Sequence, residues 1–294
     1  MYWHRVAVMK RKIVQALTAI ITNANIQGFL KGTIYQGKLK NVCVPGLNCY
    51  SCPGALGSCP IGSLQAVLGS YKYKISYYVI GLILLFGGIL GRWICGWLCP
   101  FGLLQELLYK IPSKKAKLQG NWKKLSWVRY PVLIIFVIII PMFVVNIAGV
   151  GSPAFCKYIC PAGTIEAALP LMLLDTSLFL SVGWLFILKA GIALAVIIGS
   201  VFLFRPFCRI LCPLGLIYGW LNKVSLYQME IDTDKCTSCG KCQVQCKLDI
   251  DIYKNPTSME CIRCGECKPV CPTQAITSGI KFRKKPQNSD EKIT

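Results

Sequence analysis

Two runs of cysteines near the C-terminus have a spacing that suits iron–sulfur clusters. Residues 236–246 read C-T-S-C-G-K-C-Q-V-Q-C, and residues 261–272 read C-I-R-C-G-E-C-K-P-V-C-P. In the spacing C-x2-C-x2-C-x3-C, three thiolates wrap one cubane and the fourth, a helical turn later, reaches the other one. We therefore predict two [4Fe–4S] clusters, one held by Cys236, Cys239, Cys242 and Cys271 and the other by Cys261, Cys264, Cys267 and Cys246. A zinc site would instead use two separated C-x2-C pairs.

A second set of cysteines forms a repeat in the apolar part of the chain. Proline follows six of the 18 cysteines, and four of these continue as C-P-x-G, beginning at Cys59, Cys99, Cys160 and Cys212. The last three are preceded four residues earlier by Cys95, Cys156 and Cys208, whereas Cys52 stands seven residues before Cys59. Six residues after the C-P cysteines come Gln65, Gln105, Glu166 and Tyr218. Because proline disfavours helical geometry in the residue before it, each unit is predicted to be a helix, a break and a second helix. The cysteine then lies at the N-cap, where the helix dipole favours the thiolate.

Long apolar segments predict a membrane protein. Residues 77–95, 130–148 and 179–204 are each long enough to cross about 30 Å of hydrocarbon. Residues 13–30 form a weaker fourth segment that contains Gln15 and Asn23, so an interfacial amphipathic helix is the alternative there. The predicted fold is an α-helical membrane protein with about four transmembrane helices in two internal repeats, followed by a C-terminal α+β domain with two [4Fe–4S] clusters.

The distribution of charge favours four spans. With the N-terminus inside, 26 of the 33 Lys and Arg residues lie on the inner side, as the positive-inside rule requires. Three spans would place one of two basic regions outside. We therefore expect a multi-pass protein of the plasma membrane in contact with lipid, with the N-terminus and the C-terminal domain on the cytoplasmic side. The predicted units are a transmembrane domain (1–224), a cluster-binding domain (225–280) and a polar tail (281–294).

This topology sorts the remaining cysteines into an inner set and an outer set. We hypothesise an inner membrane [4Fe–4S] cluster held by Cys95, Cys99, Cys208 and Cys212. A second, outer cluster would use Cys52, Cys59, Cys156 and Cys160, with Cys49 as an alternative ligand. For the inner pairs the alternative is plain buried thiols, and for the outer cysteines it is disulfides.

Other residues narrow the chemistry. His4 is the only histidine and no C-x-x-C-H occurs, which argues against bis-histidine haem and covalent haem. The net charge of +21 is explained as a topology signal rather than as nucleic-acid binding. Lys189 falls inside a predicted span, where a charge is costly. It either snorkels outward or lies at a cofactor, beside a cluster or a quinone headgroup.

The motifs resemble the NapH- and NosR-like membrane ferredoxins. The resemblance rests on C-G-W-L-C-P (95–100) and C-R-I-L-C-P (208–213), which are flanked by spans and followed by the two-cluster domain. It covers residues 77–275 and implies electron transfer between the quinone pool or cytoplasmic donors and redox enzymes, or a role in metal-centre assembly. The chain lacks the S/T-G-A-T-type sequence that binds covalent FMN in some relatives. Its outer cysteines are absent from simpler members.

The sequence therefore predicts an electron carrier, or an electron-transfer subunit of an oxidoreductase. It would pass single electrons between a cytoplasmic donor and a membrane or external acceptor, with a ferredoxin, flavoprotein or reductase subunit as redox partner and no nucleic acid. The alternatives are a thiol–disulfide or redox-sensing protein that uses the outer cysteines, and a metal-centre assembly factor. A bilayer core of about 30 Å is too long for one efficient electron hop. Transfer across it requires re-entrant clusters, a quinone or a partner cofactor.

Overall fold

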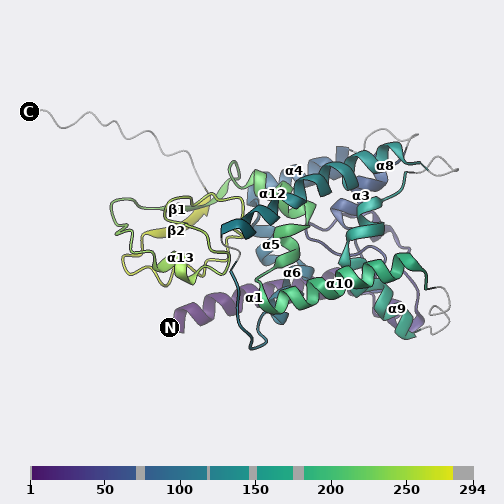
Figure 1. The fold of residues 1–294 in the computed structure, drawn as a ribbon, viewed down its shortest axis with the longest axis horizontal. Coiled ribbons are helices and arrows are strands. Elements are labelled where there is room, and N and C mark those ends of the chain that lie inside the picture. The colour runs from purple at the N-terminus through teal and green to yellow at the C-terminus, as the bar shows by residue number, and fades with distance from the viewer. Residues whose placement is uncertain (1, 71–76, 118–119, 146–150, 175–181, 281–294) are drawn as a thin grey trace, which may run out of the picture.

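In the computed structural model, long helices run along the length of the molecule and a small sheet lies at one end (Figure 1). The N-terminus and the last described residues lie near that same end. The structure describes residues 2–70, 77–117, 120–145, 151–174 and 182–280. The predicted polar tail, 281–294, lies outside the described residues.

Four helical segments provide the length of the molecule. They are α1 (Tyr2–Thr22), α4 (Tyr77–Leu90), the continuous run of α7 (Arg129–Pro131), η3 (Val132–Ile139) and α8 (Ile140–Phe143), and α10 (Trp184–Phe202). Two of them, Lys124–Phe143 and Trp184–Phe202, are long and apolar enough to cross a membrane. The apolar helix α4 has 14 residues, which at 1.5 Å per residue is shorter than a bilayer core.

Residues 13–30, predicted as the fourth and weaker span, do not form one continuous helix. Helix α1 ends at Thr22, and α2 (Ile26–Lys31) follows only after a break. In the break, the amide of Asn23 donates to the Ala19 carbonyl at 3.0 Å and that of Asn25 donates to the Pro53 carbonyl at 2.8 Å. These side-chain hydrogen bonds compete with the helical ladder and end the helix.

The other predicted spans also have different bounds. Residues 77–95 are not one helix, because the chain turns at Gly91, where φ is +55°, before α5 (Trp93–Trp97). The helix predicted over 130–148 ends at Phe143, and the one predicted over 179–204 is described from Trp184 to Phe202. Residues 146–150 and 175–181 lie outside the described part of the chain.

The predicted helix, break and helix is found in the units of Cys99, Cys160 and Cys212, whereas turns and an isolated bridge precede the break in the unit of Cys59. Cys59, Cys99 and Cys212 have extended backbone geometry at the N-caps of α3 (Pro60–Leu68), α6 (Pro100–Leu108) and α12 (Pro213–Leu221). Cys160 is likewise extended, between η4 (Phe155–Ile159) and η5 (Gly163–Ala168). The short helix α11 (Pro206–Ile210) precedes α12 and carries Cys208.

The C-terminal part is a small α+β unit. Strands β1 (Tyr227–Ile231) and β2 (Ile276–Ile280) pair antiparallel, with Tyr227 opposite Ile280, and α13 (Lys241–Gln245) lies between them in sequence. The remaining elements are η1 (Lys38–Asn41), η2 (Gly120–Val128) and α9 (Leu169–Leu174). The sheet holds the two ends of the cysteine-rich segment together.

The long helices carry apolar side chains outside and polar side chains inside. On α1, Ile20 and Ile21 are 65% and 67% exposed, whereas Arg11 and Gln15 are fully buried. Exposed apolar residues also line α10, among them Ile187. Water-soluble proteins have the opposite pattern, with apolar side chains inside and charged ones outside.

Candidate metal centres

The C-terminal cysteines line two cavities. One is lined by Cys236, Cys239, Cys242 and Cys271, and the other by Cys246, Cys261, Cys264 and Cys267. These are the two groups of four that the spacing predicts. In each run the residue before the second cysteine and the glycine after it have positive φ: Ser238 and Gly240, and Arg263 and Gly265. Such turns form concave nests of N–H groups that suit an anionic cluster.

The chemistry of this donor set fits a metal cluster. Burial, followed by the charge of Glu266, raises the pKa of the Cys264 thiol to about 12. At neutral pH its sulfur therefore carries a proton unless a metal replaces it. None of the 18 cysteines forms a disulfide in this structure. Among the described residues, no three Cys, His, Asp or Glu side chains lie close enough together to hold a single metal ion.

The inner set comes together between two pairs of short helices. Cys95 and Cys99 come from α5 and the N-cap of α6, and Cys208 and Cys212 come from α11 and the N-cap of α12. All four are buried, and the thiols that act electrostatically on Cys212 are the other three. The backbone N–H of Gly215 donates to the Cys212 sulfur at 3.4 Å. The fold thus gathers four thiols from two separate repeats.

The outer cysteines line a cavity of about 290 Å³. Four thiols line it: Cys49, Cys59, Cys156 and Cys160. Cys52 is buried but does not line this cavity, and the charges that act on it are those of Glu166 and Lys40. The arrangement therefore brings together the alternative outer set, with Cys49 in place of Cys52. The thiol of Cys43 lies apart, 3.3 Å from the Ser63 hydroxyl.

Lys189 belongs to this outer cavity. Its ammonium is among the groups that line the cavity, and it acts electrostatically on Cys156. A Cβ on Gly163 would lie 3.4 Å from the Lys189 nitrogen and 3.7 Å from the Cys49 sulfur. Lys189 therefore lies beside the outer thiols.

The three groups of thiols are linked by direct packing. The sulfur of Cys99 lies 4.0 Å from the carbonyl oxygen of Leu47, two residues before Cys49. On the other side, Gly96 packs so closely on Ile262 that a Cβ there would lie 2.4 Å from the Ile262 carbonyl oxygen. Ile262 follows Cys261, a residue of the second C-terminal cavity. The inner set therefore lies between the outer set and the C-terminal cavities.

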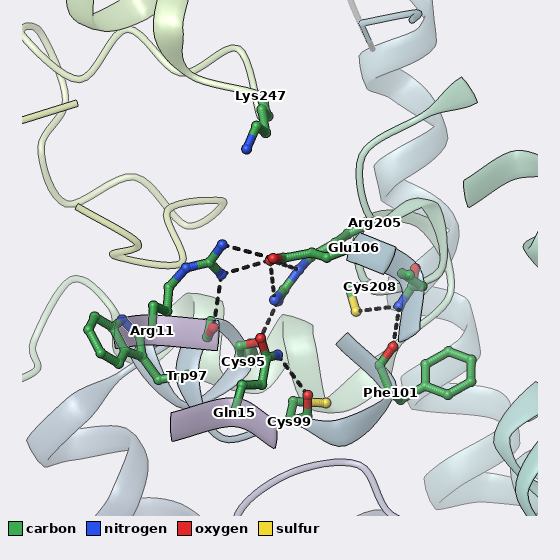
Figure 2. A network of polar contacts seen from close by, with 12 residues as sticks. Arg11, Gln15, Cys95, Trp97, Cys99, Phe101, Glu106, Arg205, Cys208 and Lys247 are labelled. Carbon is green, nitrogen blue, oxygen red and sulfur yellow. Dashed lines mark hydrogen bonds and ion pairs between the residues drawn. The ribbon is translucent and has the colours of Figure 1, made fainter. Parts of the chain in front are cut away.

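A buried ionic network lies beside the inner set (Figure 2). Glu106 accepts two hydrogen bonds from Arg11, at 2.7 and 2.8 Å, and two from Arg205, at 2.6 and 3.0 Å. Burial alone would raise the pKa of Glu106, but Arg205 and Arg11 outweigh it and hold that pKa at about 2. Arg205 also donates to the carbonyl of Cys95 and Arg11 to that of Gly96. The network fixes the backbone that presents the inner thiols.

The sequence does not single out this network. Arg11 stands in the run Lys10-Arg11-Lys12, which is explained as a topology signal, yet Arg11 is fully buried. Glu106 looks like one more acidic residue of an amphipathic helix. The one signal in the sequence is that acidic residues are scarce, because the chain of 294 residues has only 12.

The chain is similar in sequence to families and proteins described as iron–sulfur or ferredoxin-type. A family described as "4Fe-4S binding domain" matches residues 75–119, 131–169 and 178–228, and a second family with the same description matches residues 258–277. Uncharacterized protein MJ0750 of Methanocaldococcus jannaschii is 33% identical over 224 residues, which are 74% of this chain and 83% of that protein. Ferredoxin-type protein NapH of Haemophilus influenzae is 23% identical over 68% of this chain and 67% of its own length. Regulatory protein NosR of Pseudomonas aeruginosa is 25% identical over 59% of this chain and 23% of its own length. No solved structure matches the chain.

Proposed function

The chain belongs to the NapH/NosR-like family of 4Fe–4S ferredoxin-type proteins, and on this premise we propose that it carries single electrons across a membrane. When bound, [4Fe–4S] clusters supply one-electron redox chemistry. Four sets of four cysteines would hold them: the two C-terminal sets, the inner set, and the outer set of Cys49, Cys59, Cys156 and Cys160. The donor would be a cytoplasmic redox protein and the acceptor a membrane or external one.

The observation that carries this proposal is the close packing that joins the outer set, the inner set and the C-terminal set of Cys261. Ile262 connects the C-terminal set of Cys261 to the inner set through Gly96, and Leu47 connects the inner set to the outer one through Cys99. The outer cysteine segment thus folds inward onto the inner set. One hop of about 30 Å is replaced by several shorter ones.

Membrane insertion is supported by the reversed polarity of the helices. Exposed Ile20, Ile21 and Ile187 face outward on α1 and α10, whereas Arg11 and Gln15 lie inside. Lipid accepts apolar side chains, and charged groups inside a membrane face the protein interior. We place the end with the N-terminus and the sheet in the cytoplasm of a multi-pass plasma membrane protein, because the positive-inside rule puts the basic N-terminal segment and the basic segment after the last predicted span on that side.

The donor would bind at a cleft in the C-terminal unit. This cleft has a volume of about 1140 Å³ and is lined by Cys264 and Cys271, one residue from each C-terminal cysteine set. Lys10 and Lys268 also line it. A donor with an acidic face, such as a small ferredoxin or flavoprotein, has the complementary charge.

Iron and sulfide quantification tests the proposal. Protein purified without oxygen should contain about sixteen iron atoms per chain, four for each cysteine set. About eight would mean that only the C-terminal sets bind clusters and would overturn the membrane path. The double variant Cys156→Ser and Cys160→Ser separates electron transfer from thiol–disulfide chemistry. Loss of one EPR signal supports electron transfer, and a change in thiol titration alone supports disulfide chemistry.

A further inference from the structure

Two glutamines in different C-P-x-G units make the same three hydrogen bonds. Gln65 on α3 and Gln105 on α6 each stand six residues after the cysteine of a C-P-x-G unit. The Nε2 group of Gln65 donates to the Cys156 sulfur at 3.2 Å, and that of Gln105 donates to the Cys208 sulfur at 3.2 Å. Each glutamine thus donates to a cysteine that lies two C-P-x-G units further along the chain.

The other two bonds fix the orientation of each amide. The Oε1 atom of Gln65 accepts the backbone N–H of Phe155 at 2.9 Å, and that of Gln105 accepts the N–H of Phe207 at 3.2 Å. The second hydrogen of each Nε2 group is directed to the carbonyl four residues earlier, at 3.3 Å and 3.4 Å. A flipped amide would place its oxygen against the sulfur and its NH2 group against a backbone N–H. The donor is therefore held toward the thiol.

The residues at the same position in the other two C-P-x-G units do not donate to a cysteine sulfur. Glu166 accepts the backbone N–H of Cys49 at 2.8 Å, and Tyr218 donates to the carbonyl of Pro45 at 3.0 Å. Among the described residues, each membrane cysteine set thus has one glutamine donor. A buried amide that donates to a thiolate stabilises the more negative, reduced state, and hydrogen bonds to sulfur help to set cluster potentials.

We propose that Gln65 and Gln105 are paired positioning residues that raise the reduction potentials of the outer and inner membrane clusters, respectively. This inference rests on the proposed function, because it requires clusters at both cysteine sets. It assigns a role to the repeated position after each C-P cysteine. The same amide–sulfur contact then makes two neighbouring sites similar in potential, which suits transfer in small steps.

The test is an EPR-monitored redox titration of the full-length protein with iron counting. Gln105→Leu should lower the reduced-to-oxidised ratio of the inner signal about tenfold at a fixed potential, which is a shift of 59 mV for one electron. Gln65→Leu should do the same to the outer signal only. Variants that lack Cys208 or Cys156 identify the two signals. If a leucine variant does not fold, Gln105→Glu retains the acceptor for Phe207 and should also lower the potential.

Gln15→Leu is the matched control. Gln15 is fully buried and donates to the carbonyl oxygen of Cys99 at 2.8 Å, and it has no bond to sulfur. Loss of the Gln15 side-chain amide should leave the reduction potentials of both membrane clusters unchanged. Equal shifts in Gln15→Leu and Gln105→Leu, or unchanged potentials at full iron content, would overturn this inference alone. About eight iron atoms in the wild type would overturn the proposed function together with it.

Discussion

The choice between Cys49 and Cys52 as the fourth outer ligand offers a sharp test of the structure. Both cysteines lie in one short segment, and the spacing of the repeat favours Cys52 because it is the nearest cysteine before Cys59. The cavity, however, is lined by Cys49 and not by Cys52. We therefore compare Cys49→Ala with Cys52→Ala, which remove the same sulfur atom from positions three residues apart.

The expected magnitude follows from the ligand count. Cys49→Ala leaves three thiolates in the outer cavity, so its cubane either loses one iron or is lost. The iron content should then fall by one to four of about sixteen atoms per chain. Cys52→Ala should retain all of them. Because Cys52 is 4% exposed, its variant should cost about 1 kcal/mol in stability, as for the loss of a small buried group.

Iron and sulfide analysis with EPR on both variants checks this expectation, and Cys43→Ala serves as a second control. Cys43 is equally buried, but its sulfur contacts the hydroxyl of Ser63 and not the cavity. Retention of all iron in Cys49→Ala, together with iron loss in Cys52→Ala, would refute the assignment. The outer ligands would then be Cys52, Cys59, Cys156 and Cys160, as the repeat spacing predicts.

Three further perturbations have defined outcomes. Glu106→Gln leaves the buried guanidinium of Arg205 without its anion and leaves Arg11 with Glu266 alone, and it should destabilise the protein by about 3–5 kcal/mol in thermal unfolding. In the folded protein the pKa of Glu106 is about 2, against an ordinary value of 4.5. The stability that its ionised carboxylate contributes is therefore present above pH 4.5 and is lost as the pH falls toward 2. The variant should lose this part of the pH dependence of stability. Gly96→Ala places a Cβ against a backbone carbonyl and should slow electron transfer into the membrane sets in rapid-mixing experiments, whereas Gly81→Ala, which meets nothing within 4 Å, should not. Lys189→Met removes the cation of the outer cavity and should lower the outer potential by about 59 mV without loss of iron; an unchanged potential would place the ammonium away from the cluster.

Local rules predicted the parts of the structure that depend on neighbouring residues. The effect of proline on the preceding residue predicts the extended geometry at Cys59, Cys99 and Cys212. Ligand spacing groups the C-terminal cysteines in the same way as the two cavities. In both cases the determining residues lie within a few positions of each other.

The features that escaped prediction depend on contacts between distant segments. Cys49 rather than Cys52 lines the outer cavity because its loop packs on Gly163, more than one hundred residues later. Arg11 is buried because Glu106 meets it 95 residues along the chain. Helix α1 ends at Thr22 because Asn23 bonds to Asn48 at 3.0 Å as well as to its own helix. Hydrophobic periodicity carries no information about such partners.

The buried arginines indicate a second role for the positive charge of the chain. Among the described residues, six arginines are buried but only two acidic side chains, Glu106 and Glu266, are buried with them. The buried arginines are Arg11, Arg92, Arg129, Arg205, Arg209 and Arg263. A buried cation is costly unless an anion lies nearby. Glu260 pairs with Arg92 and Arg129, and Arg92 also lies within electrostatic reach of Cys95 and Cys208. Anionic clusters on those thiolates would add negative charge beside these arginines. The net charge of +21 then reflects topology and also the need to compensate the clusters, and iron loading should stabilise the fold itself.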